Sequence, residues 1–176
     1  MSFFFEILIG GLLSGLMYSL VALGFVLIYK ASGVFNFAQG AMVYFAALAV
    51  VGLMDKGLPM WAAVIGAFIV MIIVGMSTER FVLRKLVNQP PITLFMATIG
   101  LSFFLEGLGP LLFGNEVRPI QLGIVDEPIE SILTRFNIVV SKFDLAAALI
   151  AAVLVAGLAL FFQYTKVGRA LRAVAD

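Results

Sequence analysis

Apolar runs long enough to cross a membrane constrain the fold of this chain more than any other feature. Four of them cover Ile7–Tyr29, Met60–Met76, Ile92–Leu112 and Leu145–Phe162. A helix of ~20 apolar residues spans the ~30 Å hydrocarbon core of a bilayer. A water-soluble domain would need far more charge on its surface than the 12% of charged residues found here. We therefore predict an all-α integral membrane protein.

A fifth apolar segment is irregular. Ala41–Met54 has 14 residues, too few to cross a bilayer as one helix. It becomes long enough if Val34–Gly40 also lies at membrane depth, where backbone can leave the helical geometry only if protein or water satisfies its polar groups. Gly33 and Gly40 would supply the flexible joints. The prediction is a polytopic bundle with about five membrane segments, the second one broken.

Charge predicts the orientation of these segments. The stretches 77–91 and 163–176 each carry three bases against one acid, whereas 113–144 carries three bases and five acids. Short basic segments beside a membrane remain in the cytoplasm. We therefore expect 77–91 and 163–176 inside and 113–144 outside.

Composition excludes several classes of function. The chain has no His and no Cys, which removes thiol catalysis, zinc, haem and iron–sulfur ligation. Its net charge of +1 gives no basic surface for nucleic acid. It contains no GxxxxGK[ST] sequence, so a P-loop for ATP is absent too. We expect no catalytic residue, no metal and no cofactor on this chain.

Two neutral amides stand out in the predicted interruption. Asn36 and Gln39 offer donors and acceptors that can meet freed backbone groups or a polar solute. Broken helices form the substrate route in many transporters, but polar side chains also hold membrane helices together. Residue chemistry leaves both interpretations open.

One acid is embedded in an apolar run. Ionisable groups inside a membrane are functional candidates by default, and Glu106 is the acid in question. The run ends at Leu112, so a carboxylate at this position could also reach the outer interface. The sequence leaves open whether Glu106 lies on a solute path inside the membrane or at the outer interface.

Small residues mark two helix faces. Gly11, Gly15 and Ser19 recur every four residues, and so do Ala148, Ala152 and Ala156. Such faces let neighbouring helices approach closely in a membrane. We expect close helix packing on both.

Three blocks of sequence resemble one known family. SGLMYSLVALGFVLIYKASGVFNFAQGAM (14–42), ATIGLSFFLEG (97–107) and GRALRAVAD (168–176) resemble, in this order, blocks of the branched-chain amino acid ABC permeases of the LivH type. The blocks cover the whole chain but only the front part of a family member. The resemblance implies that residues 1–176 are the N-terminal part of a single transmembrane permease domain.

The resemblance also implies a function, in the bacterial inner (plasma) membrane. A permease of this type pairs with a second permease subunit, cytoplasmic ATP-binding subunits and a periplasmic substrate-binding protein, and ATP is bound by the separate subunit. Gln39 stands where His is common in relatives, so no titrating role is implied. The implied translocation pathway comprises Asn36, Phe37, Gln39 and Gly40, to which we add the embedded acid Glu106 as a candidate. The implied approach to the ATPase comprises Gly168, Arg169, Arg172 and Asp176.

Alternatives to branched-chain amino acid import remain at this point. Urea and short-chain amide permeases resemble the same group, and a truncated, non-functional fragment is a further alternative; we expect residues 1–176 alone to insert into a membrane without transporting. A membrane-embedded enzyme would need a carboxylate pair or a Ser/Lys dyad facing a cavity. Glu79 and Glu106 do not form such a pair, because they fall on opposite sides in the predicted topology. An ion-coupled carrier would want more buried charge than Glu106 and Lys30 supply.

Overall fold

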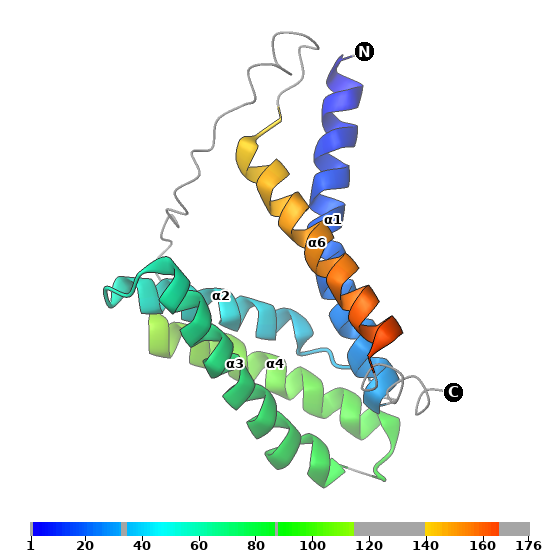
Figure 1. The fold of residues 1–176 in the computed structure, drawn as a ribbon. Helices are drawn as coiled ribbons and strands as arrows, with labels where there is room; N and C mark the ends of the chain where they lie inside the picture. Colours follow the sequence, from blue (N-terminus) through cyan, green and yellow to red (C-terminus); the bar gives the residue numbers. More distant parts are fainter. Residues whose placement is uncertain (1, 33–34, 87, 115–139, 166–176) are drawn as a thin grey trace. The chain divides into compact units, whose positions relative to one another are not determined.

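The structure is a computed structural model that describes residues 2–32, 35–86, 88–114 and 140–165. Within these residues the chain is helical (Figure 1). The elements are α1 (Ser2–Ser32), α2 (Gln39–Asp55), α3 (Met60–Phe81), the short 3₁₀ helix η1 (Leu83–Leu86), α4 (Pro91–Phe113) and α6 (Lys142–Tyr164).

Each of the five predicted segments is a helix, which confirms the all-α membrane class. Four helical stretches are long and apolar enough to cross a bilayer, namely Phe3–Lys30, Met60–Leu86, Pro91–Phe113 and Lys142–Phe161. The fifth, α2, is a shorter apolar helix of 17 residues. At 1.5 Å per residue α2 is about 26 Å long, which is less than the ~30 Å hydrocarbon core.

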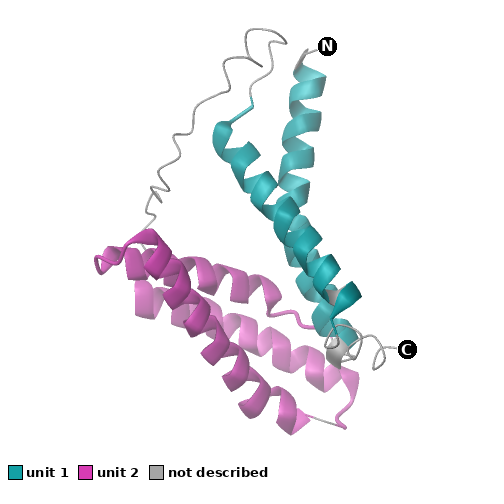
Figure 2. Ribbon diagram, in the orientation of Figure 1, with its two compact units in different colours: residues 1–31, 121–176 teal, residues 32–120 magenta. Residues whose placement is uncertain are grey.

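The helices fall into two units (Figure 2). One unit comprises residues 32–120 and contains α2, α3, η1 and α4. In it, α2 packs against both α3 and α4. The other unit comprises residues 1–31 and 121–176, and its described helices are α1 and α6.

Local sequence explains where several helices begin. Pro59 and Pro90 are the N-cap residues of α3 and α4, with extended backbone that does not continue a preceding helix. Ser141 caps α6, since its hydroxyl accepts a hydrogen bond from the Phe143 N–H at 3.0 Å. Gly57 makes the turn between α2 and α3. Its φ of 89° is a backbone conformation that residues with a side chain rarely adopt.

The segment 77–91 is less of a loop than the charge pattern suggests. Helix α3 runs five residues beyond Met76 to Phe81, and η1 follows almost at once. The basic side chains of this region, Arg80, Arg84 and Lys85, therefore lie on helical turns and are exposed. Bases in the last turn of a helix also interact favourably with its dipole.

The core of the α2–α3–α4 unit is built on Ala41, Phe45 and Leu105. Ala41, Phe45, Ala49 and Gly52 are the buried residues of α2, and their spacing places them along one helix face. Partly buried side chains of α3 and α4 pack against this cluster, among them Val70, Val74, Leu101 and Leu108.

Glycines allow α2 and its neighbours to approach closely. A Cβ atom at Gly52 would overlap the Phe113 side chain, with the Phe113 Cβ at 2.9 Å. A Cβ at Gly109 would lie 2.8 Å from the Leu48 Cδ1, and one at Gly66 would lie 2.8 Å from the Leu53 Cδ1. Small residues at such crossings are typical of membrane helix packing, where lipid supplies no hydrophobic drive between helices.

Only part of the two small-residue faces predicted from sequence is buried against a neighbouring helix. On α1, Gly11 and Gly15 have open space where a Cβ would stand. On α6, Ala148 is buried but Ala156 is exposed, and Ala151 rather than Ala152 is the second fully buried alanine. Within the described residues, the close packing expected of the glycine face is thus not seen; glycine contacts of this kind occur at α2 instead.

We predict that Gly52→Ala destabilises the α2–α4 contact by about 1–3 kcal/mol, the usual penalty for overpacking. The added methyl would meet the ring base of Phe113, which cannot swing aside as the end of a flexible chain can. Gly109→Ala should cost less because it meets the tip of Leu48. Thermal unfolding in detergent, followed by fluorescence of Trp61, the one Trp of the chain, measures both.

Gly107→Ala is the matched control, since a Cβ at Gly107 has nothing within 4 Å. Equal unfolding temperatures for Gly52→Ala and Gly107→Ala would contradict the packing described for α2 and α4.

Candidate functional site

The helical geometry breaks just before α2, as predicted from the Gly-bounded segment. Phe35 and Asn36 have no regular structure, and Phe37 and Ala38 form a turn. The helix then begins at Gln39. The prediction that Val34–Gly40 is interrupted is therefore confirmed for 35–38 but wrong at its end, because Gln39 and Gly40 already belong to the first turn of α2. Gly33 and Val34 lie outside the described residues.

Asn36 organises this turn. Its side-chain Oδ1 accepts a hydrogen bond from the Ala38 N–H at 3.1 Å, and its backbone carbonyl accepts one from the Gln39 N–H at 3.2 Å. Its amide Nδ2 donates to the Met42 Sδ at 3.8 Å, a weak acceptor. Because Ala38 is fully buried, its N–H would be costly to leave without a partner.

Aromatic rings attach the turn to α4. The Phe37 and Phe95 ring centroids are 4.6 Å apart at an interplanar angle of 83°, an edge-to-face contact, and the Phe35 ring lies 4.9 Å from that of Phe37. Edge-to-face pairs of this kind add about 0.5–1.5 kcal/mol beyond the area they bury. The turn is thus held beside a helix long enough to cross the membrane.

The turn lies towards one end of α4. Phe95 is four residues from the start of α4 at Pro91, a rise of about 6 Å. The glycine contacts place Gly109 beside Leu48 and Phe113 beside Gly52, so α2 and α4 run in the same direction. The interruption is therefore level with the first turns of α4 rather than with its middle.

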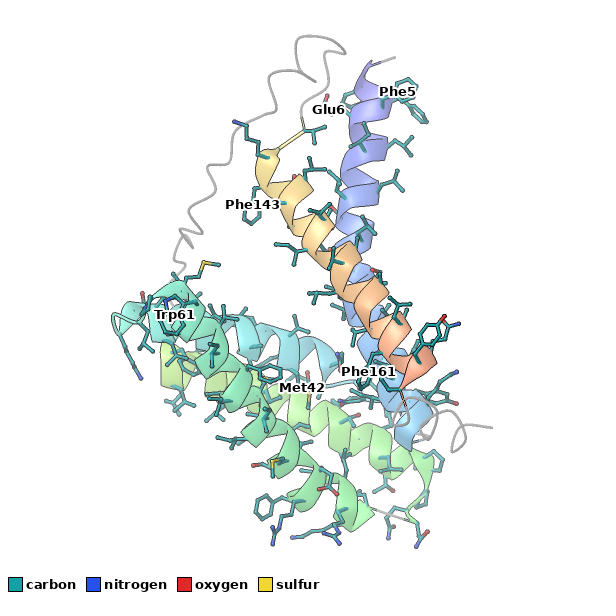
Figure 3. The ribbon with its side chains drawn as sticks, in the orientation of Figure 1. Phe5, Glu6, Met42, Trp61, Phe143 and Phe161 are labelled. Atoms are coloured by element: carbon teal, nitrogen blue, oxygen red, sulfur yellow. The ribbon has the colours of Figure 1, made fainter. Side chains whose placement is uncertain are left out.

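The candidate residues of the turn differ in exposure. Asn36 is 6% exposed, Gln39 is half-buried, and Phe37 and Gly40 are exposed. A Cβ at Gly40 would meet nothing within 4 Å. Met42, one turn into α2, packs against the core cluster (Figure 3). The exposed or half-buried side of the turn therefore consists of Phe35, Phe37, Gln39 and Gly40, all uncharged.

Glu106 lies apart from this turn, and its place in the translocation pathway stays a prediction. It lies eleven residues beyond Phe95 on α4, about 16 Å along the helix axis. Its side chain is exposed, next in sequence to the buried Leu105, and its Oε1 accepts a hydrogen bond from the Ser102 hydroxyl at 3.1 Å. Pro110, which has no N–H, stands four residues later and leaves the Glu106 carbonyl without its usual helical donor. Glu106 thus lies in a polar surrounding of its own on α4, away from the turn before α2.

The residues implied for the approach to the ATPase cannot be placed. Gly168, Arg169, Arg172 and Asp176 all lie outside the described residues. Among the residues that the structure describes, no group of three His, Cys, Asp or Glu side chains could hold a metal ion.

Sequence reasoning left the role of Asn36 open between a backbone partner and a solute contact, and it missed the part played by the two phenylalanines. An Asn whose side chain bonds the backbone two residues on is a common way to form a turn before a helix, and Asn36 precedes Ala38 by two residues. This signal was present in the sequence. Phe95 as the partner of Phe37 could not have been found, because their contact joins segments 58 residues apart.

Comparison with known proteins identifies the family. The model for the family described as "Branched-chain amino acid transport system / permease component" matches residues 7–176. This chain belongs to that family.

Its curated relatives are distant in sequence. The chain is 26% identical to the high-affinity branched-chain amino acid transport system permease protein LivH of Salmonella typhimurium over 183 residues, which cover 99% of the chain and 59% of the relative. It is 28% identical to the corresponding permease protein BraD of Pseudomonas aeruginosa, covering 96% of the chain and 58% of BraD. LivH of Escherichia coli K12 is 24% identical with the same coverage as the Salmonella protein.

The chain therefore spans about three fifths of the length of the curated relatives it matches. No solved structure matches it at a significant level. The family and the long apolar helices together establish a multi-pass membrane protein of the permease family.

We predict that Asn36→Leu exposes the start of α2 to solvent exchange. Losing the Oδ1 acceptor leaves the buried Ala38 N–H unpaired, at a cost of about 1–3 kcal/mol. Hydrogen exchange of the amides from Ala38 to Met42 should therefore accelerate. Asn36→Asp, which keeps the acceptor oxygen, should preserve most of the protection. Unchanged exchange in Asn36→Leu would contradict the role given to this side chain.

Proposed function

We propose that this chain is the membrane-spanning permease part of an ATP-driven importer for branched-chain amino acids in the bacterial inner membrane. The family match over residues 7–176 is the observation that carries the proposal. Relatives that bear the names of branched-chain amino acid transport permeases, aligned over nearly all of the chain, support the same cargo.

In this proposal the interruption before α2 forms part of the solute route. Phe37, Gln39 and Gly40 present an uncharged surface beside α4. A zwitterionic amino acid needs partners for both its ammonium and its carboxylate, and an amide can hydrogen-bond either group without the strong attraction of a full charge. The Phe37 ring would meet a branched apolar side chain by dispersion contact.

Asn36 and Gln39 would have different roles. Asn36 is buried and its Oδ1 accepts a hydrogen bond within the turn, so it would hold the turn in place without contacting the solute. Gln39 is half-buried on the first turn of α2 and would meet the solute directly. Glu106, about 16 Å from Phe95 along α4, would not contact the solute together with Gln39.

Other subunits would supply energy and capture. The chain has no P-loop sequence, so ATP would be hydrolysed on cytoplasmic subunits. A second permease subunit would complete the membrane part, and a periplasmic binding protein would deliver the amino acid. This chain would act as a conduit and not as an enzyme.

Uptake by the assembled transporter tests the proposal. The permease that carries these residues, reconstituted with its cognate ATP-binding subunits and binding protein, should take up radiolabelled leucine only with ATP. Unlabelled isoleucine and valine should compete, whereas urea and acetamide should not. Competition by urea or acetamide alone would assign the chain to the amide branch and overturn the proposed cargo.

We expect Gln39→Leu to lower leucine uptake about tenfold, the factor for one lost hydrogen bond to a charged group at the weak end of its range. Assembly of the complex should be unchanged, because the Gln39 side chain is partly open to its surroundings. Gln89→Leu, the same substitution at an exposed position just before α4, is the control. Normal uptake by Gln39→Leu would return Gln39 to a packing role.

A further inference from the structure

A groove between α3 and α4 lies outside the candidate site. It has a volume of ≈ 470 Å³, within the ~300–1,000 Å³ typical of ligand sites. Its walls are mostly apolar and come from the end of α3 and the middle of α4. The lining residues are Ser77, Thr78, Phe81, Val82, Ala97, Gly100, Leu101 and Phe104.

The groove runs from the end of α3 into the apolar part of the bundle. Phe81 and Val82 stand where α3 ends. On α4 the lining extends from Ala97 to Phe104, a rise of about 10 Å. Gly100 leaves the wall open, since a Cβ there would meet nothing within 4 Å. An extended hydrocarbon chain that enters at the end of α3 would lie against apolar side chains along this length.

Three basic residues follow or interrupt the lining residues at the end of α3. Arg80 lies between the lining residues Thr78 and Phe81, and Arg84 and Lys85 follow on η1, which packs against both α3 and α4. All three side chains are exposed. Glu79 is the one acid in this stretch, so three bases against one acid leave a net charge of two positive.

We propose that this groove binds an anionic phospholipid, with an acyl chain between α3 and α4 and the phosphate at Arg80, Arg84 and Lys85. Basic residues between membrane helices recognise acidic headgroups, and an apolar groove open at the same end accepts the chain attached to such a headgroup. The Ser77 hydroxyl, half-buried in the wall, is placed to donate to the glycerol ester region. The charge pattern predicts that this end faces the cytoplasm, where short basic segments are retained.

The three bases without the groove would bind anionic lipid in a different way. Exposed lysines and arginines beside a membrane attract any anionic surface, without a defined site. A defined lipid-binding site requires the groove as well as the bases. Two glycines on α4 distinguish a defined site from general attraction. Both are exposed, and a Cβ at either would meet nothing within 4 Å. Gly100 lines the groove, whereas Gly107, seven residues later, does not.

Native mass spectrometry of the 176-residue chain in a zwitterionic detergent tests this proposal with dioleoyl phosphatidylglycerol and dioleoyl phosphatidylcholine. We expect one phosphatidylglycerol to bind at least tenfold more tightly than phosphatidylcholine, because each base near an anionic headgroup contributes about 1 kcal/mol and ~1.4 kcal/mol is a tenfold change. Changing Arg80, Arg84 and Lys85 together to Gln should remove this preference. Changing Lys30 and Lys56, exposed bases elsewhere on the chain, to Gln should not.

Gly100→Leu should weaken binding of both lipids by filling the groove, whereas Gly107→Leu should bind like the unchanged chain. Ala97→Leu, which fills the groove from a neighbouring position, is the second variant, and circular dichroism verifies the helix content of each. Equal affinity for the two lipids, or unaltered binding in both groove-filling variants, would overturn the proposal. So would a change of oligomeric state in Gly100→Leu, because it would show that another protein chain occupies the groove.

Discussion

The need to satisfy every backbone polar group inside a bilayer governs this structure. Helices meet that need by themselves, which is why the long apolar stretches are helical. The described chain departs from helix beside α4 at residues 35–38, and there the Asn36 side chain takes over a backbone hydrogen bond to Ala38. One buried amide thus supplies an acceptor for a backbone N–H in this interruption, and the proposed solute route includes it.

Close packing holds α2 in place despite its short length. Helix α2 buries Ala41, Phe45, Ala49 and Gly52, so its neighbours α3 and α4 can approach at small residues. Phe113 fills the space opposite Gly52, and Phe95 receives Phe37 near the other end of α4. Helix α4 thus fixes both the turn and the far end of α2, which links the candidate site to the core of the unit.

Much of this fold follows from the sequence because its causes are local. Hydropathy predicts all five helices, and the polar segment before Ala41 predicts the interruption, although α2 begins at Gln39 and so includes Gly40. The rest depends on contacts between distant residues. Pairing of Phe37 with Phe95, the use of Gly52 and Gly109 in place of the glycine face of α1, and the position of Glu106 away from the turn all require the packed structure. Sequence identified Asn36 as important but could not choose between a solute contact and a support for the turn.

In the proposed function, the turn before α2 faces a water-filled solute route. Because the chain has no native Cys, a single cysteine can report on it. In the assembled transporter, Gln39→Cys should react with a membrane-impermeant thiol reagent, and leucine delivered by the binding protein should slow that reaction. Phe68→Cys, on the exposed apolar face of α3, should stay unreactive in lipid. A cysteine at position 39 as inert as one at position 68, or equally reactive with and without leucine, would contradict this account.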